Sequence, residues 1–195
     1  PDGAGPPHAR AGSGSPEQQY QLAGPAVPTS PICHHAVHPV SVLQTEYSLF
    51  ERDVEQLFPV LRELCIGFVP YSPLGRGFIT GQAMPAAEYP VDDMRSFDPR
   101  WQPGNYERNT EAVTRLAEFA GARGASLPQL ALAWLLAQGD DIVPIPGFRS
   151  PERVAENVGA AGLDLTADDL AQIDAILPAG GHGARYVDAM LPTWE

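Results

Sequence analysis

The chain has 195 residues, of which 12 are basic and 24 are acidic, giving a formal net charge of -12. This acidic excess disfavours nucleic acid and anionic membranes as partners. No stretch of the sequence approaches a membrane span, and two cysteines provide no disulfide framework. We therefore expect a cytoplasmic protein with neither kind of partner, while its oligomeric state is not indicated.

All 12 basic residues are arginines. A mechanism that needs a lysine, as a Schiff base or as an ammonium that adjusts a neighbouring pKa, therefore cannot be completed by this chain alone. His34, His35 and His38 follow an H-H-x-x-H pattern, but no carboxylate-bearing helix frames them. We expect surface histidines there and no metal site.

The first part of the chain differs in composition from the rest. Residues 1–31 carry Pro or Gly at 12 positions and show almost no apolar periodicity. Such a segment buries too little surface to offset the entropy of ordering it. We predict that residues 1–34 are disordered and that residues 35–195 form the folded part.

Strands and helices are then predicted to alternate. Residues 40–44 and 66–71 are short, apolar and β-rich, which is typical of buried strands. Between them, Asp53 and Gln56 suggest a capped helix that continues to Leu64 with one apolar face. Residues 82–106 lack periodicity and are predicted to form a long loop.

The second half continues the pattern with three further capping signals. An amphipathic helix is predicted at 110–122, a buried helix after Ser126, and a strand at 142–145. Ser150 with Pro151 predicts the next helix start, and Thr166 starts the last helix. The tail, residues 180–195, shows no pattern. Repeated strand–helix units with right-handed crossovers imply parallel strands, in an open sheet or a closed (β/α)8 barrel.

Two strand exits have the features of anion sites. GFVPYSPLGRGFITG places three glycines after one strand, and PGFRSPERV leads from the next strand into a helix N-terminus. Arg149 and Arg153 could bind a phosphate there, or be solvated first-turn charges. Tyr71 could stack on a flat ring or pack in the core, and Gln44 could bind a carboxamide or simply end a strand.

These segments, together with QTEYSLF and QLALAWLLAQ, resemble the C-terminal half of the aldo-keto reductases in the same order. The resemblance covers about residues 34–190 and implies an α/β fold, the last three βα units of a truncated (β/α)8 TIM barrel. It also implies NADPH as cofactor and a small carbonyl compound, an aldehyde or ketone, as substrate of an oxidoreductase.

The resemblance assigns cofactor contacts to thirteen residues. Gln44 and Tyr71 correspond to contacts with the nicotinamide, and a second group lines the pyrophosphate: Ser72, Leu74, Gly75, Arg76 and Gly77. A third group corresponds to the 2′-phosphate clamp and the adenine contacts: Gly147, Phe148, Arg149, Arg153, Glu156 and Asn157. Many relatives carry Lys or Ser where this chain has Gly147 and Phe148, so the two arginines are expected to supply most of the charge.

No catalytic residue is assigned in this chain. The Asp, Tyr, Lys and His used by the family lie on the first four strands of the barrel, upstream of the resemblance, and this chain has no lysine. Three functions therefore stay open: the cofactor-binding half of a carbonyl reductase, a non-catalytic nucleotide-binding or regulatory module, and an inactive fragment.

Overall fold

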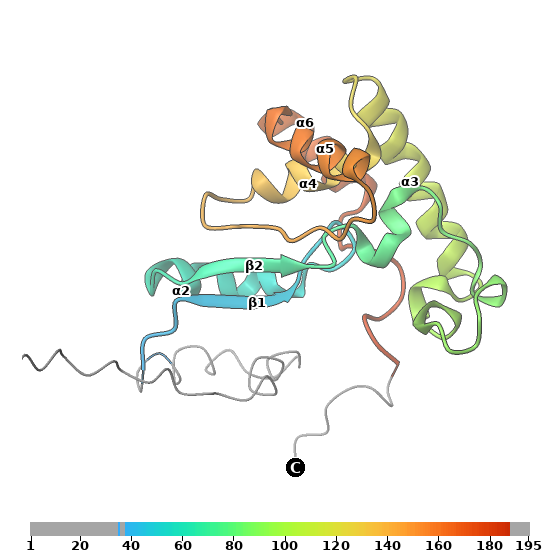
Figure 1. Ribbon diagram of the computed structural model, residues 1–195, viewed down its shortest axis with the longest axis horizontal. Coiled ribbons are helices and arrows are strands. Elements are labelled where there is room, and N and C mark those ends of the chain that lie inside the picture. The colour runs from blue at the N-terminus through green and yellow to red at the C-terminus, as the bar shows by residue number, and fades with distance from the viewer. Residues whose placement is uncertain (1–34, 36–37, 188–195) are drawn as a thin grey trace, which may run out of the picture.

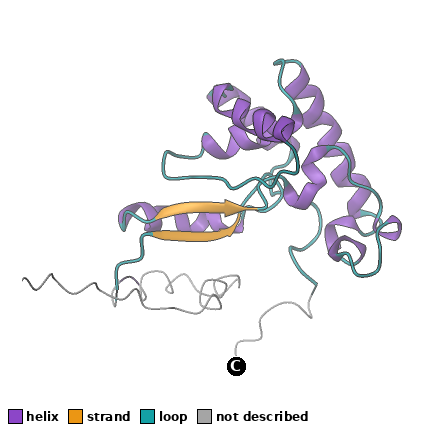
Figure 2. Cartoon of the chain, in the orientation of Figure 1, coloured by secondary structure: helices purple, strands orange, loops and turns teal. Residues whose placement is uncertain are grey.

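The structure is a computed structural model in which residue 35 and residues 38–187 are described. The predictions made for residues 1–34 lie outside these residues. Helices surround a small parallel sheet, with α4, α5 and α6 drawn above it and α3 beyond its arrowhead end (Figures 1 and 2). Among the described residues, no helix is long and apolar enough to cross a membrane.

The sheet consists of β1 (Val42–Glu46) and β2 (Gly67–Tyr71), paired in parallel as the alternation predicts. The expected strand at 142–145 also lies beside β2, where the Val143 and Ile145 amides donate to the carbonyls of residues 68 and 70. Ile142 makes only an isolated bridge with Phe68. Prolines 144 and 146 have no N–H to continue a ladder, so this segment is extended but not a full strand.

The first predicted helix is divided in two. It consists of the 3-10 helix η2 (Asp53–Leu57) followed by α2 (Phe58–Glu63). The predicted cap at Asp53 is wrong, because the N-cap residue is Arg52 and no side chain caps this end. Pro59 lies in the first turn of α2, where a missing amide is tolerated, and thus marks a new helix start.

The long loop is more ordered than its sequence suggests. It contains three short 3-10 helices, η4 (Ala86–Glu88), η5 (Met94–Ser96) and η6 (Pro99–Trp101). The carboxylates of Asp93 and Asp98 accept backbone N–H groups at the starts of η5 and η6. The following helix, α3 (Asn105–Gly121), begins five residues before the predicted start.

The remaining helix starts agree with the capping signals. Ser126, Ser150 and Thr166 cap α4 (Leu127–Leu136), α5 (Pro151–Gly159) and α6 (Ala167–Ile176). Two further 3-10 helices are η3 (Gly75–Thr80), directly after β2, and η7 (Ala160–Gly162). Helix α4 is buried on nearly all sides, as its uniformly apolar sequence predicts.

One face of the sheet packs into the core. Phe68 of β2 is buried there and its ring lies 5.5 Å from that of Phe58 on α2 and 5.9 Å from that of Tyr47. Tyr47 in turn contacts Trp134 of α4, with the ring centroids 5.3 Å apart. Along both strands, every second side chain points to the opposite face of the sheet. That face carries the polar groups described next.

Candidate functional site

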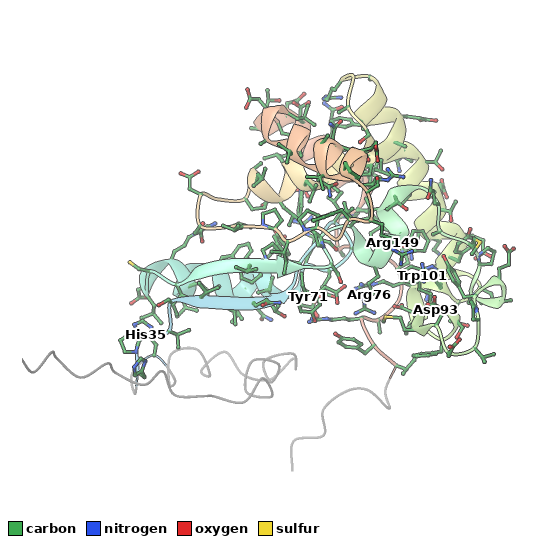
Figure 3. The ribbon with its side chains drawn as sticks, viewed as in Figure 1. His35, Tyr71, Arg76, Asp93, Trp101 and Arg149 are labelled. Atoms are coloured by element: carbon green, nitrogen blue, oxygen red, sulfur yellow. The ribbon has the colours of Figure 1, made fainter. Side chains whose placement is uncertain are left out.

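The two predicted anion loops leave the sheet at the same edge. The β2 exit loop (residues 72–81) follows β2, and the α5 entry turn (residues 146–150) follows the extended segment. The Ile145 amide donates to the carbonyl of Pro70 over 3.1 Å, so the two segments are in register just before they enter these loops. Figure 3 shows Tyr71, Arg76 and Arg149 toward this end of the sheet and His35 at the other end.

Gln44 and Tyr71 share the face of the sheet that lies opposite Phe68. The register pairs residue 44 with residue 69 and residue 46 with residue 71, and side chains two apart on a strand point the same way. Gln44 is exposed and Tyr71 is half-buried. The structure therefore brings the two predicted nicotinamide contacts to one surface.

The β2 exit loop has an unusual backbone. Five of its residues have φ between 48° and 95°: Ser72, Gly75, Arg76, Gly77 and Gly81. At Gly75, φ is 57° and a Cβ would lie 3.1 Å from the side chain of Ile79, so the backbone conformation and the packing both favour glycine. At Gly77, φ is 95° and a Cβ would meet nothing within 4 Å, so open space lies in front of this residue.

The amides of this loop differ in availability. Those of Gly75 and Gly77 donate to the carbonyls of Ser72 and Leu74, at 2.8 and 3.1 Å, so the glycines do not present free N–H groups. Within the described chain, the amides of Ser72, Leu74 and Arg76 have no hydrogen-bond acceptor. These amides, and not those of Gly75 and Gly77, are backbone donors that the loop could offer to an anion.

The α5 entry turn is open to solvent. Gly147, Phe148 and Arg149 are exposed, Phe148 by 63%. A Cβ at Gly147 would meet nothing within 4 Å. Arg149 forms no ion pair with any residue that the structure describes, and it lies just before the Ser150 cap of α5. A guanidinium and a helix N-terminus here are both available to a phosphate.

Arg153 is also exposed but has a partner. Its Nη1 donates to Glu156 Oε2 over 2.7 Å, one turn along α5. The pKa of Glu156 is lowered by a hydrogen bond with Ser126 and then by Arg153. The Glu156 carbonyl accepts from Gln129, and Asn157 beside it is half-buried. Arg153, Glu156 and Asn157 of α5 thus lie beside the polar side chains at the start of α4.

Beneath Tyr71 lies a buried ion cluster that the sequence analysis did not identify. Its centre is Glu46, the last residue of β1, whose side chain is 0% exposed. Glu46 Oε2 accepts from Arg76 at 2.6 Å and from Arg185 at 3.1 Å. Arg76 also donates to Asp98 at 2.6 Å, and its side chain is only 8% exposed. The Arg76 guanidinium is thus committed to these carboxylates, so only its backbone can serve a pyrophosphate.

Two further residues complete the ion cluster. Arg100 donates to Glu51 over 2.6 Å and lies 3.6 Å from Glu46 Oε1, an ion pair without a direct hydrogen bond. Burial raises the pKa of Glu51 more than Arg100 lowers it. Burial alone would lower the pKa of Arg76, but Glu46 and Asp98 raise it. Three guanidinium groups face three carboxylates, so the buried charge is balanced.

Arg185 and Tyr186, near the end of the described chain, connect the ion cluster to the Tyr71 side chain. Arg185 Nη2 donates to the Tyr71 hydroxyl over 2.7 Å, and the Tyr186 hydroxyl lies 3.2 Å from it. Burial, followed by the Tyr186 hydrogen bond, raises the pKa of Tyr71 to about 12 although Arg185 opposes this. Tyr71 is therefore a neutral phenol at physiological pH.

The sequence offered one partial signal for this cluster. Glu46 lies two residues after Gln44 and therefore on the same face of the sheet. A charged residue at the end of a buried strand was the signal. Arg185 and Tyr186 belong to a tail without pattern, and Asp98 and Arg100 to the loop predicted at 82–106. Among the described residues, no group of His, Cys, Asp and Glu could hold a metal ion.

Comparisons with known proteins match the chain to one family. The aldo/keto reductase family model matches residues 18–178, beginning upstream of the boundary predicted at residue 34. The chain is 40% identical over 158 residues to "Probable aldo-keto reductase 1" of Glycine max, covering 80% of this chain and 45% of that protein. It is 42% identical over 156 residues to "Aldo-keto reductase yakc [NADP(+)]" of Schizosaccharomyces pombe, covering 77% and 46%.

Solved structures give the same result. A glycerol dehydrogenase from Gluconobacter oxydans superposes with a TM-score of 0.69 at 29% identity, over 83% of this chain and 48% of that one. An aldo-keto reductase from Klebsiella pneumoniae, solved with NADPH, superposes with a TM-score of 0.53 at 24% identity, over 75% and 43%. The chain spans about half the length of these relatives, whose fold is the α/β type with a (β/α)8 barrel. It belongs to the aldo/keto reductase family.

Proposed function

We propose that this chain is the NADPH-binding part of an aldo/keto reductase, contributing the last three βα units of the barrel. The observation that carries the proposal is the convergence at one sheet edge. The β2 exit loop and the α5 entry turn leave the sheet side by side, next to the face that carries Gln44 and Tyr71. The NADP(+) in the name of the yeast relative supports the choice of cofactor.

The residues present fit a dinucleotide phosphate. Gly77 and Gly147 leave open space, and the amides of Leu74 and Arg76 are free within the described chain. We assign Ser72 and Gly75 to shaping the pyrophosphate loop, and Arg149, Arg153 and Phe148 to the 2′-phosphate end. Glu156 and Asn157 lie one turn further along α5, where an adenine would follow.

Bound NADPH would supply a hydride to the carbonyl carbon of an aldehyde or ketone. The residues of this chain would hold and orient the nucleotide, while the proton for the carbonyl oxygen requires an acid elsewhere. Because the chain has no lysine, it does not itself provide the Lys-assisted acid that the family resemblance implies. A cytoplasmic location remains a prediction from cysteine content.

Titration of the chain with NADPH, followed by nicotinamide fluorescence, tests the proposal. Arg149→Gln removes the exposed guanidinium at the α5 entry turn, and Arg115→Gln removes an exposed one on α3 as a matched control. We expect Arg149→Gln to weaken NADPH binding about tenfold, because a charge-assisted contact with the 2′-phosphate is lost. NADH, which lacks that phosphate, should show no such change.

Two results would contradict the assignment. One is wild-type chain that does not bind NADPH, and the other is an equal effect of Arg149→Gln and Arg115→Gln. A carbonyl-reduction assay on the same sample addresses the second candidate function, a non-catalytic nucleotide-binding module. The absence of lysine favours that candidate, and binding without turnover would support it.

A further inference from the structure

A single guanidinium connects the buried ion cluster with the surface proposed for the nicotinamide. Arg185 donates through Nε to Glu46 at 3.1 Å and through Nη2 to the Tyr71 hydroxyl at 2.7 Å. We propose that Arg185 is a positioning residue that fixes the ring of Tyr71 for stacking on the nicotinamide. This inference rests on the function proposed above and adds the end of the described chain to the cofactor site.

The Arg185 side chain is itself firmly held. Its Nη2 also lies 3.4 Å from Thr45 Oγ1, and its own carbonyl accepts from Arg76 Nη1 at 2.9 Å. The side chain is 14% exposed, so its charge depends on the buried Glu46 for compensation. A guanidinium so placed has little freedom to move away from Tyr71.

The backbone just before Arg185 is anchored by several contacts. This C-terminal segment (residues 180–187) runs past the arrowhead end of the sheet (Figure 1). Its Gly181 amide donates to the Phe50 carbonyl at 3.0 Å, and His182 exchanges two hydrogen bonds with Asn109 of α3. A Cβ at Gly183 would lie 2.8 Å from the Pro99 backbone, so this contact allows no side chain.

The orientation of the Tyr71 ring depends on the contacts of its hydroxyl. A tyrosine ring turns about two side-chain bonds, and Tyr71 is only partly buried, on the face of the sheet opposite Phe68. Within the described chain, its hydroxyl is bound only by Arg185 and Tyr186. Stacking depends on the plane of the ring. An anchored hydroxyl therefore holds the ring in the stacking orientation before the cofactor binds.

The competing explanation is that Arg185 only attaches the C-terminal segment. The two roles are separated by comparing NADPH with adenosine 2′,5′-bisphosphate, which has the 2′-phosphate and adenine but no nicotinamide. Both ligands are titrated calorimetrically into the full chain and into Arg185→Met and Arg185→Lys. Arg123→Met is the matched control, because Arg123 also forms an ion pair and lies over an aromatic ring, but its partners Asp169 and Phe119 lie on α6 and α3, away from the proposed site.

A positioning role predicts a selective loss. Arg185→Met should weaken NADPH binding about fivefold, the value of one aromatic stacking contact, and change bisphosphate binding by less than about twofold. Arg185→Lys should behave like Arg185→Met, since an ammonium cannot span Glu46 and Tyr71 with two fixed donors. Arg123→Met should change neither affinity. Equal weakening of both ligands by Arg185→Met, or no change in either, would overturn the proposal.

Tyr71→Phe provides a second test that leaves the ion cluster intact. It keeps the ring but removes the hydroxyl that Arg185 binds, so we expect the same selective loss of NADPH affinity. The double variant Tyr71→Phe/Arg185→Met should lose no more NADPH affinity than either single variant, because both changes break the same hydrogen bond. Unchanged NADPH binding in Tyr71→Phe would refute the role of Arg185. A wild-type chain that binds neither ligand would instead reject the proposed function, and this inference with it.

Discussion

The two loops at the sheet edge use their arginines and polar groups in opposite ways. The β2 exit loop uses most of its polar groups internally, and its arginine is buried between Glu46 and Asp98. The α5 entry turn leaves Arg149 exposed and without an ion-pair partner in the described chain. An arginine in a glycine-rich loop is therefore not by itself a phosphate ligand. Here the buried arginine supports the loop, and the exposed one is available for binding.

The difference in burial also implies a difference in energetic role. Removing one member of a buried, balanced ion cluster leaves its partners uncompensated in a low-dielectric environment, which is costly. An exposed charge is surrounded by water and contributes little to stability. Substitutions in the β2 exit loop and its ion cluster should therefore affect folding, whereas those in the α5 entry turn should affect binding.

The largest effect is expected for Glu46→Gln. The change keeps the side-chain shape but leaves Arg76, Arg100 and Arg185 facing two carboxylates instead of three. We expect the free energy of unfolding, measured by urea denaturation, to fall by about 3–5 kcal/mol. The control Glu118→Gln, at an exposed position on α3, should change it by less than about 0.5 kcal/mol. Similar values for the two variants would show that the ion cluster does not support the fold.

A smaller effect separates the glycines of the two loops. Gly75→Ala places a Cβ at φ 57° and 3.1 Å from Ile79, and should cost about 1–2 kcal/mol of unfolding free energy. Gly147→Ala meets no atom within 4 Å and has no positive φ, so it should cost less than about 0.5 kcal/mol. Thermal denaturation of both variants checks this, and a larger loss at residue 147 would reverse the comparison.

The smallest effect is a difference in pH dependence. Burial raises the pKa of Glu51 in the folded chain, so its contribution to stability is present below pH 4.5 and is lost as the pH rises through the folded pKa. The pKa of Glu156 is lowered, so its contribution is present above pH 4.5 and is lost as the pH falls.

Urea denaturation between about pH 3 and pH 7 measures both contributions. The stability of the wild type relative to Glu51→Gln should decrease with rising pH, whereas that relative to Glu156→Gln should increase. The same sign for both pairs would contradict the assigned environments of the two carboxylates.

Local chemistry was enough to predict several elements. Ser126, Ser150 and Thr166 mark helix starts correctly, because a side-chain oxygen caps the amides two or three residues along the chain. Pro144 and Pro146 indicate that the last predicted strand cannot form a full ladder of hydrogen bonds. The Asp53 cap is wrong because the helix begins one residue earlier, with Arg52 as N-cap. The division of this helix follows from Pro59, which starts a second helix that a capping signal at Asp53 does not reveal.

The sequence by itself determined the parallel strand–helix alternation, the two glycine-containing strand exits and the membership of the family that shares them. It did so because turns, caps and alternating apolar positions act over a few residues. Only the tertiary structure decided that Arg76 is buried and Arg149 exposed, and that Arg185 meets Tyr71 from 114 positions away. Ion pairs between distant segments depend on where the whole chain places them, and no local pattern encodes that position.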